Sequence, residues 1–201
     1  MISHKHKCIF IHIPRCGGSS IETGIVGKDW WSIESLTKHI LASTAKKIYK
    51  DYWQDYFKFS FVRNPWERMV SLALWPDFYG SRIKNGKLDV SNYFKKFPVA
   101  EIDPRSKSRG ECVSKVNNSV YFNIINEDID FIGRYENLQE DFNIICDKIG
   151  IPQQQLPHVK YNRFLKIKHK HYTEYYDDEA RDIVAEKYAK DIEYFGYEFG
   201  E

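Results

Sequence analysis

The chain has 201 residues, of which 42% are hydrophobic and 16% aromatic, and its formal net charge is +2. This composition excludes a disordered chain, and so small a charge gives no reason to expect nucleic acid as a partner. No apolar segment approaches the roughly 18 residues of a membrane span, and the apolar run near the start lacks a signal-peptide cleavage site. We therefore expect one domain over residues 1–201, without a membrane span.

The four cysteines show no metal-binding or redox spacing, because no two of them form C-x-x-C. A chain of this length needs no disulfide to stabilise its core. We therefore expect reduced thiols and a cytoplasmic protein. The cysteines are Cys8, Cys16, Cys112 and Cys146.

The first unit of the chain combines a strand, a glycine loop and the start of a helix. Residues 8–13, CIFIHI, form a short and mostly apolar run, which is typical of a buried parallel strand. Residues 14–18, PRCGG, form the loop after it, and Ser19 to Glu22 match the capping box S-x-x-E. We expect a helix that begins at Ser19.

The second unit repeats this order. Residues 57–62, FKFSFV, alternate and are rich in aromatic side chains, which predicts another strand. Asn64 is a favourable N-cap, Pro65 suits the first helical position, and Glu67 lies three residues after the cap. We expect a helix from there to about Trp75, ended by the proline that follows.

Later segments continue the alternation of strands and helices. Residues 129–135 predict a strand, and the helix after it begins near Asn137 and ends at Gly150. Another helix is capped by Asp177, and its apolar face is expected to reach Ile192. Strands that alternate with helices favour an α/β fold with a parallel sheet. Further expectations are a helix over 43–53, a helix over 91–97, a polar loop over 103–110 and a basic surface loop over 158–176.

The glycine loop has the features of an anion site, because ligands of an open α/β sheet bind at the carboxyl ends of its strands. Gly17 and Gly18 allow close approach of the backbone to an anion. Ser19 and Ser20 offer hydroxyl donors, and Arg15 offers a fixed positive charge. The loop lacks the first glycine and the lysine of the ATP-binding pattern G-x-x-x-x-G-K-S/T. The alternative is a tight strand-to-helix turn with an ordinary cap.

A second basic group follows the second predicted strand. Arg63 ends that strand and Ser71 lies about two turns into the next helix, so one phosphate could contact both. The alternative is that Arg63 pairs with Glu67 and that Ser71 is an ordinary helix residue. Two anion sites at neighbouring strand ends suggest a ligand with phosphate groups at both ends of a nucleoside.

Both motifs resemble those of sulfotransferases. HIPRCGGSS, residues 12–20, is similar to their 5′-phosphosulfate loop, I-P-K-T-G-G-S/T-S. FSFVRNPWERMVSL, residues 59–72, is similar to their 3′-phosphate motif, F-x-F/V-V-R-N-P-W/Y-x-R-x-x-S. DFIGRYENLQEDF and the final DIEYFGYEF also resemble later segments of this family, in its carbohydrate-type branch related to heparan and chondroitin sulfotransferases. The resemblance implies a P-loop-like, three-layer α/β fold with a central, mostly parallel sheet flanked by helices.

The resemblance also implies transfer of a sulfuryl group from 3′-phosphoadenosine 5′-phosphosulfate (PAPS), with adenosine 3′,5′-bisphosphate as the product and no metal. Arg15 stands where the family has a lysine that stabilises the departing phosphate oxygen; arginine keeps the charge but is planar and longer. Cys16 replaces a threonine, and we expect it to face the sheet. By resemblance, the 5′ end binds to Arg15, Cys16, Gly17, Gly18, Ser19 and Ser20, and the 3′-phosphate binds to Arg63 and Ser71.

The late basic loop adds two lysines to this site. As in related enzymes, Lys166 and Lys168 are expected to close over the 3′-phosphate of the cofactor. The alternative is that this loop is merely a solvated basic face.

Transfer to a neutral hydroxyl needs a group that accepts its proton, and histidine has an unperturbed pKa of about 6.5. His39 is the best candidate among the seven histidines, because it resembles the base of family members that carry an H-x-x-A segment. Glu34 is a competing base, whereas His12 is expected to be a packing residue. Trp30 and Trp31 either stack on an acceptor sugar or belong to the core.

Three functions fit these residues, and we predict the first. It is a sulfotransferase that uses PAPS as donor and a hydroxyl of a carbohydrate or small molecule as acceptor. The second is a small-molecule kinase of P-loop type, which needs ATP, magnesium and an acidic metal ligand. The third is a nucleotide- or glycan-binding module without turnover, which the arginine at position 15 keeps open. The H-x-H stretches lack further ligands, so no metal site is expected.

Overall fold

The computed structural model describes residues 1–74, 83–89, 119–159 and 170–201. Its main sheet has the strand order β1-β2-β3-β6. The strands are β1 (Ile2–Ser3), β2 (Cys8–Ile11), β3 (Phe57–Val62) and β6 (Phe131–Arg134). Strands β2, β3 and β6 run parallel, and β1 is antiparallel to β2. The predicted α/β fold with a mostly parallel sheet is confirmed.

The centre of this sheet is buried, and the burial includes the polar side chains of Lys58 and Ser60 on β3. All four residues of β2 are buried, and β3 is buried from Lys58 onwards. Phe10 and Phe59 are register partners on β2 and β3, and their rings stack with centroids 4.9 Å apart. The continuous apolar run of β2 is typical of a parallel strand with both faces covered.

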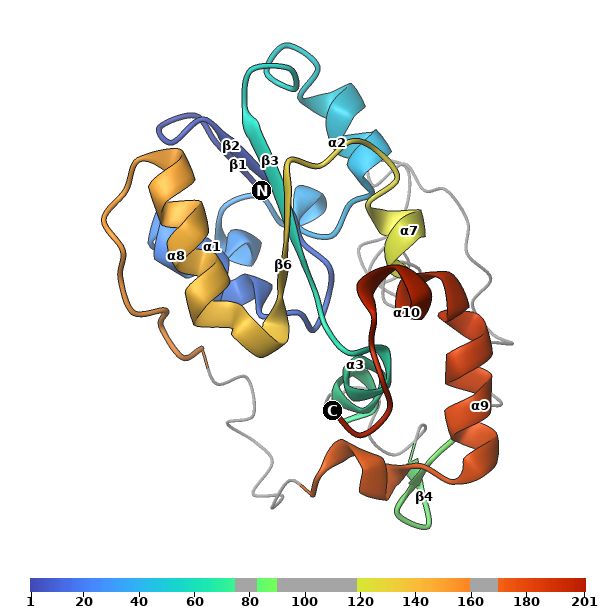
Figure 1. Ribbon diagram of the computed structural model, residues 1–201. Coiled ribbons are helices and arrows are strands. Elements are labelled where there is room, and N and C mark those ends of the chain that lie inside the picture. Colours follow the sequence, from blue (N-terminus) through green and yellow to red (C-terminus); the bar gives the residue numbers. More distant parts are fainter. Residues whose placement is uncertain (75–82, 90–118, 160–169) are drawn as a thin grey trace.

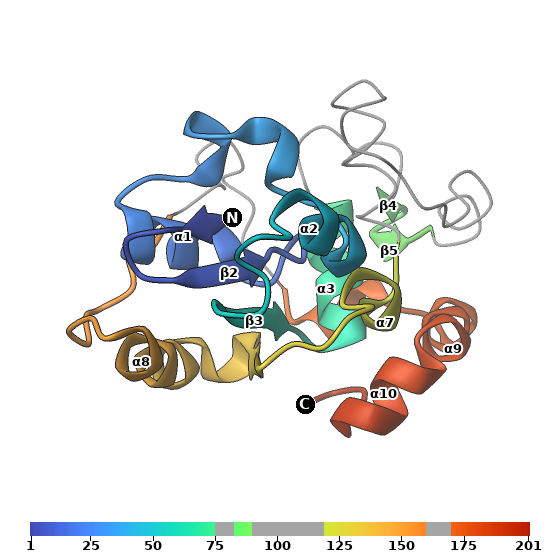
Figure 2. The ribbon, with the colours of Figure 1, turned by 90° about the horizontal axis from the view of Figure 1, so that it is seen from above.

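Helices cover both faces of the sheet, which gives three layers (Figure 1 and Figure 2). Helices α1 and α8 lie together on one side, whereas α2, α3 and α7 lie on the other. The helices are α1 (Gly18–Val26), α2 (Ala42–Ile48), α3 (Pro65–Ala73), α7 (Tyr121–Ile124), α8 (Leu138–Ile149), α9 (Asp178–Lys187) and α10 (Ala189–Phe195). Short 3-10 helices cover Trp30–Ser32 (η1), Ser35–Thr37 (η2), Tyr135–Asn137 (η3) and Tyr172–Tyr175 (η4), and β4 (Ile83–Lys84) pairs with β5 (Lys87–Leu88).

Three helix ends follow the sequence expectations. The Asn64 side chain accepts hydrogen bonds from the backbone N–H of the second and third residues of α3, and Pro65 is its first residue. Asp177 accepts from the backbone N–H of Ala180 at 2.8 Å and caps α9. Gly150 has a φ of 69° and ends α8 in the left-handed conformation, which glycine adopts without strain.

The capping box predicted at the start of α1 is wrong. The helix begins at Gly18, its N-cap is Gly17 with a φ of 79°, and no side chain caps it. The Glu22 side chain points into the protein interior, where its carboxylate accepts hydrogen bonds from His12, Lys38 and the backbone N–H of Trp30. The first N–H groups of α1 therefore keep no side-chain acceptor.

Other predicted boundaries also shift. The helix expected after Asp177 breaks at Tyr188 into α9 and α10, and the helix expected over 43–53 is the shorter α2. The start of the chain contains β1, a short strand that the sequence pattern did not predict. In the late basic segment, η4 replaces part of the expected loop. The helix predicted over 91–97 and the loop predicted over 103–110 lie outside the described residues.

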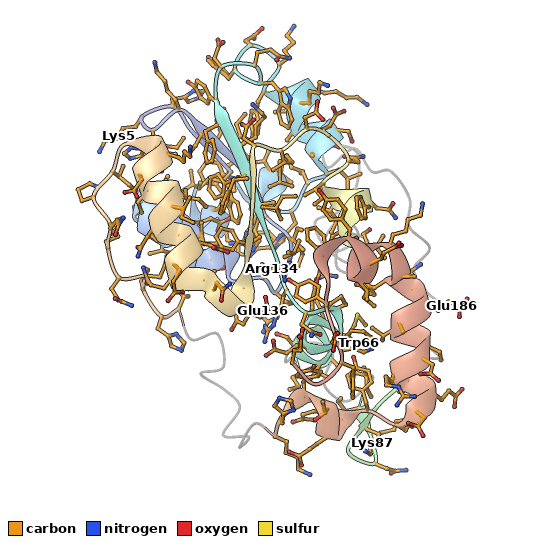
Figure 3. The ribbon with its side chains drawn as sticks, in the orientation of Figure 1. Lys5, Trp66, Lys87, Arg134, Glu136 and Glu186 are labelled. Atoms are coloured by element: carbon orange, nitrogen blue, oxygen red, sulfur yellow. The ribbon has the colours of Figure 1, made fainter. Side chains whose placement is uncertain are left out.

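The C-terminal segment closes onto the carboxyl edge of the sheet, where Figure 3 shows Arg134 and Glu136 beside it. The guanidinium of Arg134 donates to the backbone carbonyl of Phe195 and lies over the ring of Tyr197, 5.1 Å from its centroid. Glu136 accepts from the backbone N–H of Asn64 at 2.5 Å. These contacts join the end of the chain to the ends of β3 and β6.

Cys8, Cys16 and Cys146 are buried free thiols, and Cys112 lies outside the described residues. Within the described part of the chain, no helix has the length and apolar character needed to cross a membrane. The cytoplasmic location and the single domain stay predictions.

Candidate functional site

A cleft opens where the three parallel strands end. Loops that follow β2, β3 and β6 each contribute to it, as expected for a ligand site at the carboxyl edge of an α/β sheet. Its lining consists of His12, Arg15, Gly17, Gly18, Ser19, Ser20, Arg63, Tyr135, His158 and Val159. The structure therefore brings together the predicted 5′ loop and Arg63.

The glycine loop presents the start of α1 to this cleft. The first N–H groups of a helix have no intrahelical acceptor, and they carry the positive end of the helix dipole. No side chain caps these groups, so the backbone N–H groups of Gly18 and Ser19 can donate to an anion, whereas that of Ser20 donates to the carbonyl of Gly17 at 3.0 Å. Arg15 has a φ of 71°, a left-handed conformation that is uncommon for a residue other than glycine.

The two basic groups predicted as separate sites are in direct contact. Arg15 Nε donates to Ser71 Oγ at 2.9 Å, and Arg63 Nη1 donates to the carbonyl of Arg15 at 3.2 Å. Burial, and then the charge of Arg63, lowers the pKa of Arg15 to about 10. Arg15 is therefore still a cation at neutral pH.

Arg63 also makes the local pair that the sequence left as an alternative. Its Nε and Nη2 donate to the two carboxylate oxygens of Glu67, at 3.1 and 2.5 Å. The guanidinium carbon lies 3.9 Å from the centroid of the Tyr135 ring. Arg63 thus has a fixed orientation on the cleft wall, while Ser71 lies against Arg15.

Arg68 is a further residue of the second motif that holds the loop, and sequence reasoning assigned it no role. Its side chain is fully buried. It donates from Nε to the carbonyl of Pro14 at 3.0 Å and from Nη1 to the Tyr188 hydroxyl at 2.6 Å. Its position inside the segment that resembles the 3′-phosphate motif, residues 59–72, could have indicated that it has a role in the site. Arg63 and Arg68 therefore hold consecutive loop carbonyls.

His12 lines the cleft, although it was expected to be only a packing residue. Its Nδ1 lies 2.7 Å from Oε1 of Glu22. Burial lowers the pKa of His12, so the ring is neutral at neutral pH and donates from Nδ1 to the carboxylate. The lone pair is then on Nε2, which lies next to Gly18.

His39 stands beside His12, with ring centroids 4.4 Å apart. Its Nδ1 lies 3.2 Å from the backbone carbonyl of His12. A carbonyl oxygen can only accept, so Nδ1 of His39 carries the hydrogen and Nε2 keeps a lone pair. Burial, and then the neighbouring His12, lowers the pKa of His39 well below its ordinary value.

A buried network of charges supports both histidines. Glu22 Oε2 accepts from Lys38 Nζ at 2.6 Å and from the backbone N–H of Trp30 at 3.1 Å, and Lys38 also donates to Asp29. Burial opposes the ionisation of Glu22, but the hydrogen bond from His12 and the charge and hydrogen bond of Lys38 hold its pKa below the ordinary value. Sequence reasoning missed Lys38, since nothing in its local pattern marks a lysine as buried.

The remaining predicted site residues lie in different surroundings, from the core to the surface. Cys16 is buried as expected, and burial raises the pKa of its thiol to about 12, so it stays a neutral thiol. Trp30 belongs to the core, whereas the Trp31 ring lies 5.4 Å from that of His39. Glu34 is exposed. Lys166 and Lys168 lie outside the described residues.

Nothing in the described ranges groups three metal-ligating side chains in one place. The expectation that no metal takes part stays a prediction.

Comparison with known proteins adds independent findings. The sequence profile described as "Sulfotransferase family" matches residues 1–198. An uncharacterized protein of Archaeoglobus fulgidus is 30% identical over 108 residues, which cover 54% of this chain and 79% of that relative. Carbohydrate sulfotransferase 14 of Danio rerio is 22% identical over 197 residues; the alignment covers 80% of this chain and half of that protein. No solved structure gives a significant match.

Proposed function

This chain belongs to the sulfotransferase family, and from that membership we propose that it transfers a sulfuryl group from PAPS to a hydroxyl of a carbohydrate or small-molecule acceptor. One observation carries the proposal: the uncapped start of α1 and two arginines face one cleft at the carboxyl edge of the sheet. Helix amides and guanidinium groups are the donors that phosphate and sulfate oxygens need. The relative from Danio rerio carries the word carbohydrate in its name, which supports a sugar acceptor.

In the proposed reaction, the acceptor oxygen attacks the sulfur of PAPS in line with the bond to the bridging oxygen. That bond breaks, the bridging oxygen leaves with the 5′-phosphate, and a base takes the acceptor proton. The leaving phosphate gains negative charge, and the amides of α1 together with Arg15 stabilise it. The products are the sulfated acceptor and adenosine 3′,5′-bisphosphate.

We propose His39 as the base. Its Nδ1–H is held by the His12 carbonyl, which leaves Nε2 to accept a proton, and its side chain is partly exposed. His12 is a second candidate, because it lines the cleft and its ring is oriented by Glu22. A base that is itself oriented by a third group is a common catalytic arrangement.

A binding module without turnover is the second candidate function, and one observation favours it. Arg15 occupies the position of the family lysine, and its Nε is already bonded to Ser71. A guanidinium held in this way binds an anion in a fixed orientation, whereas a lysine ammonium follows a moving charge more freely.

Turnover of PAPS with a panel of carbohydrate and small hydroxyl acceptors tests the proposal, with adenosine 3′,5′-bisphosphate as the measured product. We expect sulfated product from at least one acceptor. His39→Ala is expected to lower kcat by about 100-fold or more while bisphosphate binding is kept. His12→Ala is the matched variant: if it removes turnover and His39→Ala does not, His12 is the base. Bisphosphate binding with no turnover on any acceptor would favour the binding module.

A further inference from the structure

Lys38 is a buried lysine whose ammonium contacts Ser19, one of the residues that line the cleft. Its side chain is only 1% exposed. The Nζ atom lies 2.6 Å from Oε2 of Glu22, 2.8 Å from Oδ1 of Asp29 and 3.3 Å from Oγ of Ser19. Glu22 and Ser19 belong to α1, and Asp29 belongs to the turn before η1. Lys38 therefore joins the segment that carries His39 to the helix that presents the glycine loop.

The three contacts use the full donor capacity of the ammonium. A lysine ammonium has three N–H donors and no acceptor, so every oxygen that contacts it has to accept. Ser19 Oγ therefore accepts from Lys38, and the hydroxyl hydrogen of Ser19 has to point elsewhere. Ser19 lines the cleft, so this hydrogen is available to an oxygen of a bound anion.

We propose that Lys38 is a positioning residue that turns the Ser19 hydroxyl into a preoriented hydrogen-bond donor for the 5′-phosphate of the sulfuryl donor. This inference rests on the proposed function, because it needs a phosphate at the start of α1. A hydroxyl whose oxygen already accepts from a cation is also a stronger donor, since chains of hydrogen bonds polarise one another.

A purely structural role for Lys38 predicts something different. Its bonds to Glu22 and Asp29 are sufficient to join α1 to η1, and neither Glu22 nor Asp29 itself lines the cleft. The bond to Ser19 is the one that touches a cleft residue. A structural lysine therefore affects every loop residue alike, whereas a positioning lysine acts through Ser19 alone.

The test has to keep the charge beside the anion constant. Removal of Lys38 alone leaves two carboxylates near the bound phosphate, and their repulsion would weaken binding whatever Ser19 does. Lys38→Met is therefore combined with Asp29→Asn, which removes one positive and one negative charge. Glu22 keeps His12 and the backbone N–H of Trp30 as partners.

The measurement is the Kd of adenosine 3′,5′-bisphosphate for the full chain, in a double-mutant cycle with Ser19→Ala. In the Asp29→Asn background, Lys38→Met and Ser19→Ala are each expected to weaken binding about tenfold, and the combination also about tenfold. The matched control is Ser20→Ala, whose effect is expected to multiply with that of Lys38→Met. A hundredfold loss in the Ser19 combination, or no loss from Lys38→Met, would overturn the proposal.

A second measurement needs no substitution at Lys38. The ¹⁵Nζ resonance of Lys38 is expected to shift when the bisphosphate binds to the wild type, and to stay in place in Ser19→Ala. An equal shift in both proteins, or none in either despite binding, contradicts the coupling. If the wild type binds no bisphosphate at all, the proposed function fails, which is a different outcome from a wild type that binds without coupling.

Discussion

His12 and His39 are neutral in the folded protein for the same physical reason, which is burial. A pKa below the ordinary value means that protonation is harder in the fold than in the unfolded chain. The fold therefore loses stability as the pH falls below about 6.5, the unfolded value, because the unfolded chain then binds protons more readily. At neutral pH both imidazoles are in the form that a base requires.

The pH dependence of kcat/KM tests whether His39 is a base with a lowered pKa. We expect a plateau from about pH 6.5 upwards and a fall only at lower pH, since the pKa of His39 lies well below its ordinary value. The residual activity of His39→Ala is expected to lack this acid limb, and His12→Ala is expected to keep it. A rate that still rises between pH 7 and 8 would be incompatible with a base of lowered pKa.

The start of α1 stays open to the cleft because its first residue, Gly18, has no side chain. A Cβ on Gly18 would lie 2.2 Å from Nε2 of His12, well inside van der Waals contact, so the ring and the loop cannot both keep their positions. The same close approach keeps the His12 ring against the cleft.

Gly18→Ala tests this packing. The variant is expected to lose about 1–3 kcal/mol of stability through overpacking, and to bind adenosine 3′,5′-bisphosphate at least about tenfold more weakly because the amides move. Removal of the ring with His12→Ala is expected to restore part of both losses. Gly27→Ala is the control: its φ of 77° costs about 1 kcal/mol, but a Cβ there meets nothing within 4 Å. Equal binding losses in both variants would refute the clash.

Local sequence patterns predicted the elements well where the causes are local. Neighbouring residues alone predicted the strands at 57–62 and 129–135. They also predicted the Asn64 cap of α3 and the end of α8 at Gly150. Glu22 shows the opposite case. Its spacing from Ser19 fits a capping box, but Lys38 offers a stronger, charged partner that no local pattern reveals.

At the scale of the whole molecule, distant segments converge on the glycine loop. Arg68 joins the Pro14 carbonyl to Tyr188, where the chain passes from α9 to α10. The Tyr121 hydroxyl on α7 donates to the backbone carbonyl of Arg63 at 2.5 Å. The motif that contains Arg68 therefore holds the glycine loop in position. Tyr188, between α9 and α10, in turn fixes the side chain of Arg68.

The sequence could place the cleft at the carboxyl edge of the sheet but could not predict how it is held. Arg15, the glycines and Arg63 were identifiable because each follows directly after an expected strand. The roles of Arg68, Lys38 and His12 depend on contacts between residues far apart in the chain or buried beneath the loop. Such contacts follow from the packed fold and not from any local spacing.

Calorimetric titration of the full chain shows whether the loop after β2 holds the 5′ end of a nucleotide 3′-phosphate, as we propose. Adenosine 3′,5′-bisphosphate and ATP with magnesium are compared as ligands, each with and without EDTA. We predict saturable, one-site binding of the bisphosphate that is unchanged by EDTA, and much weaker binding of ATP. Tighter binding of magnesium-ATP, or no binding of the bisphosphate, would contradict a loop built for the 5′ end of PAPS.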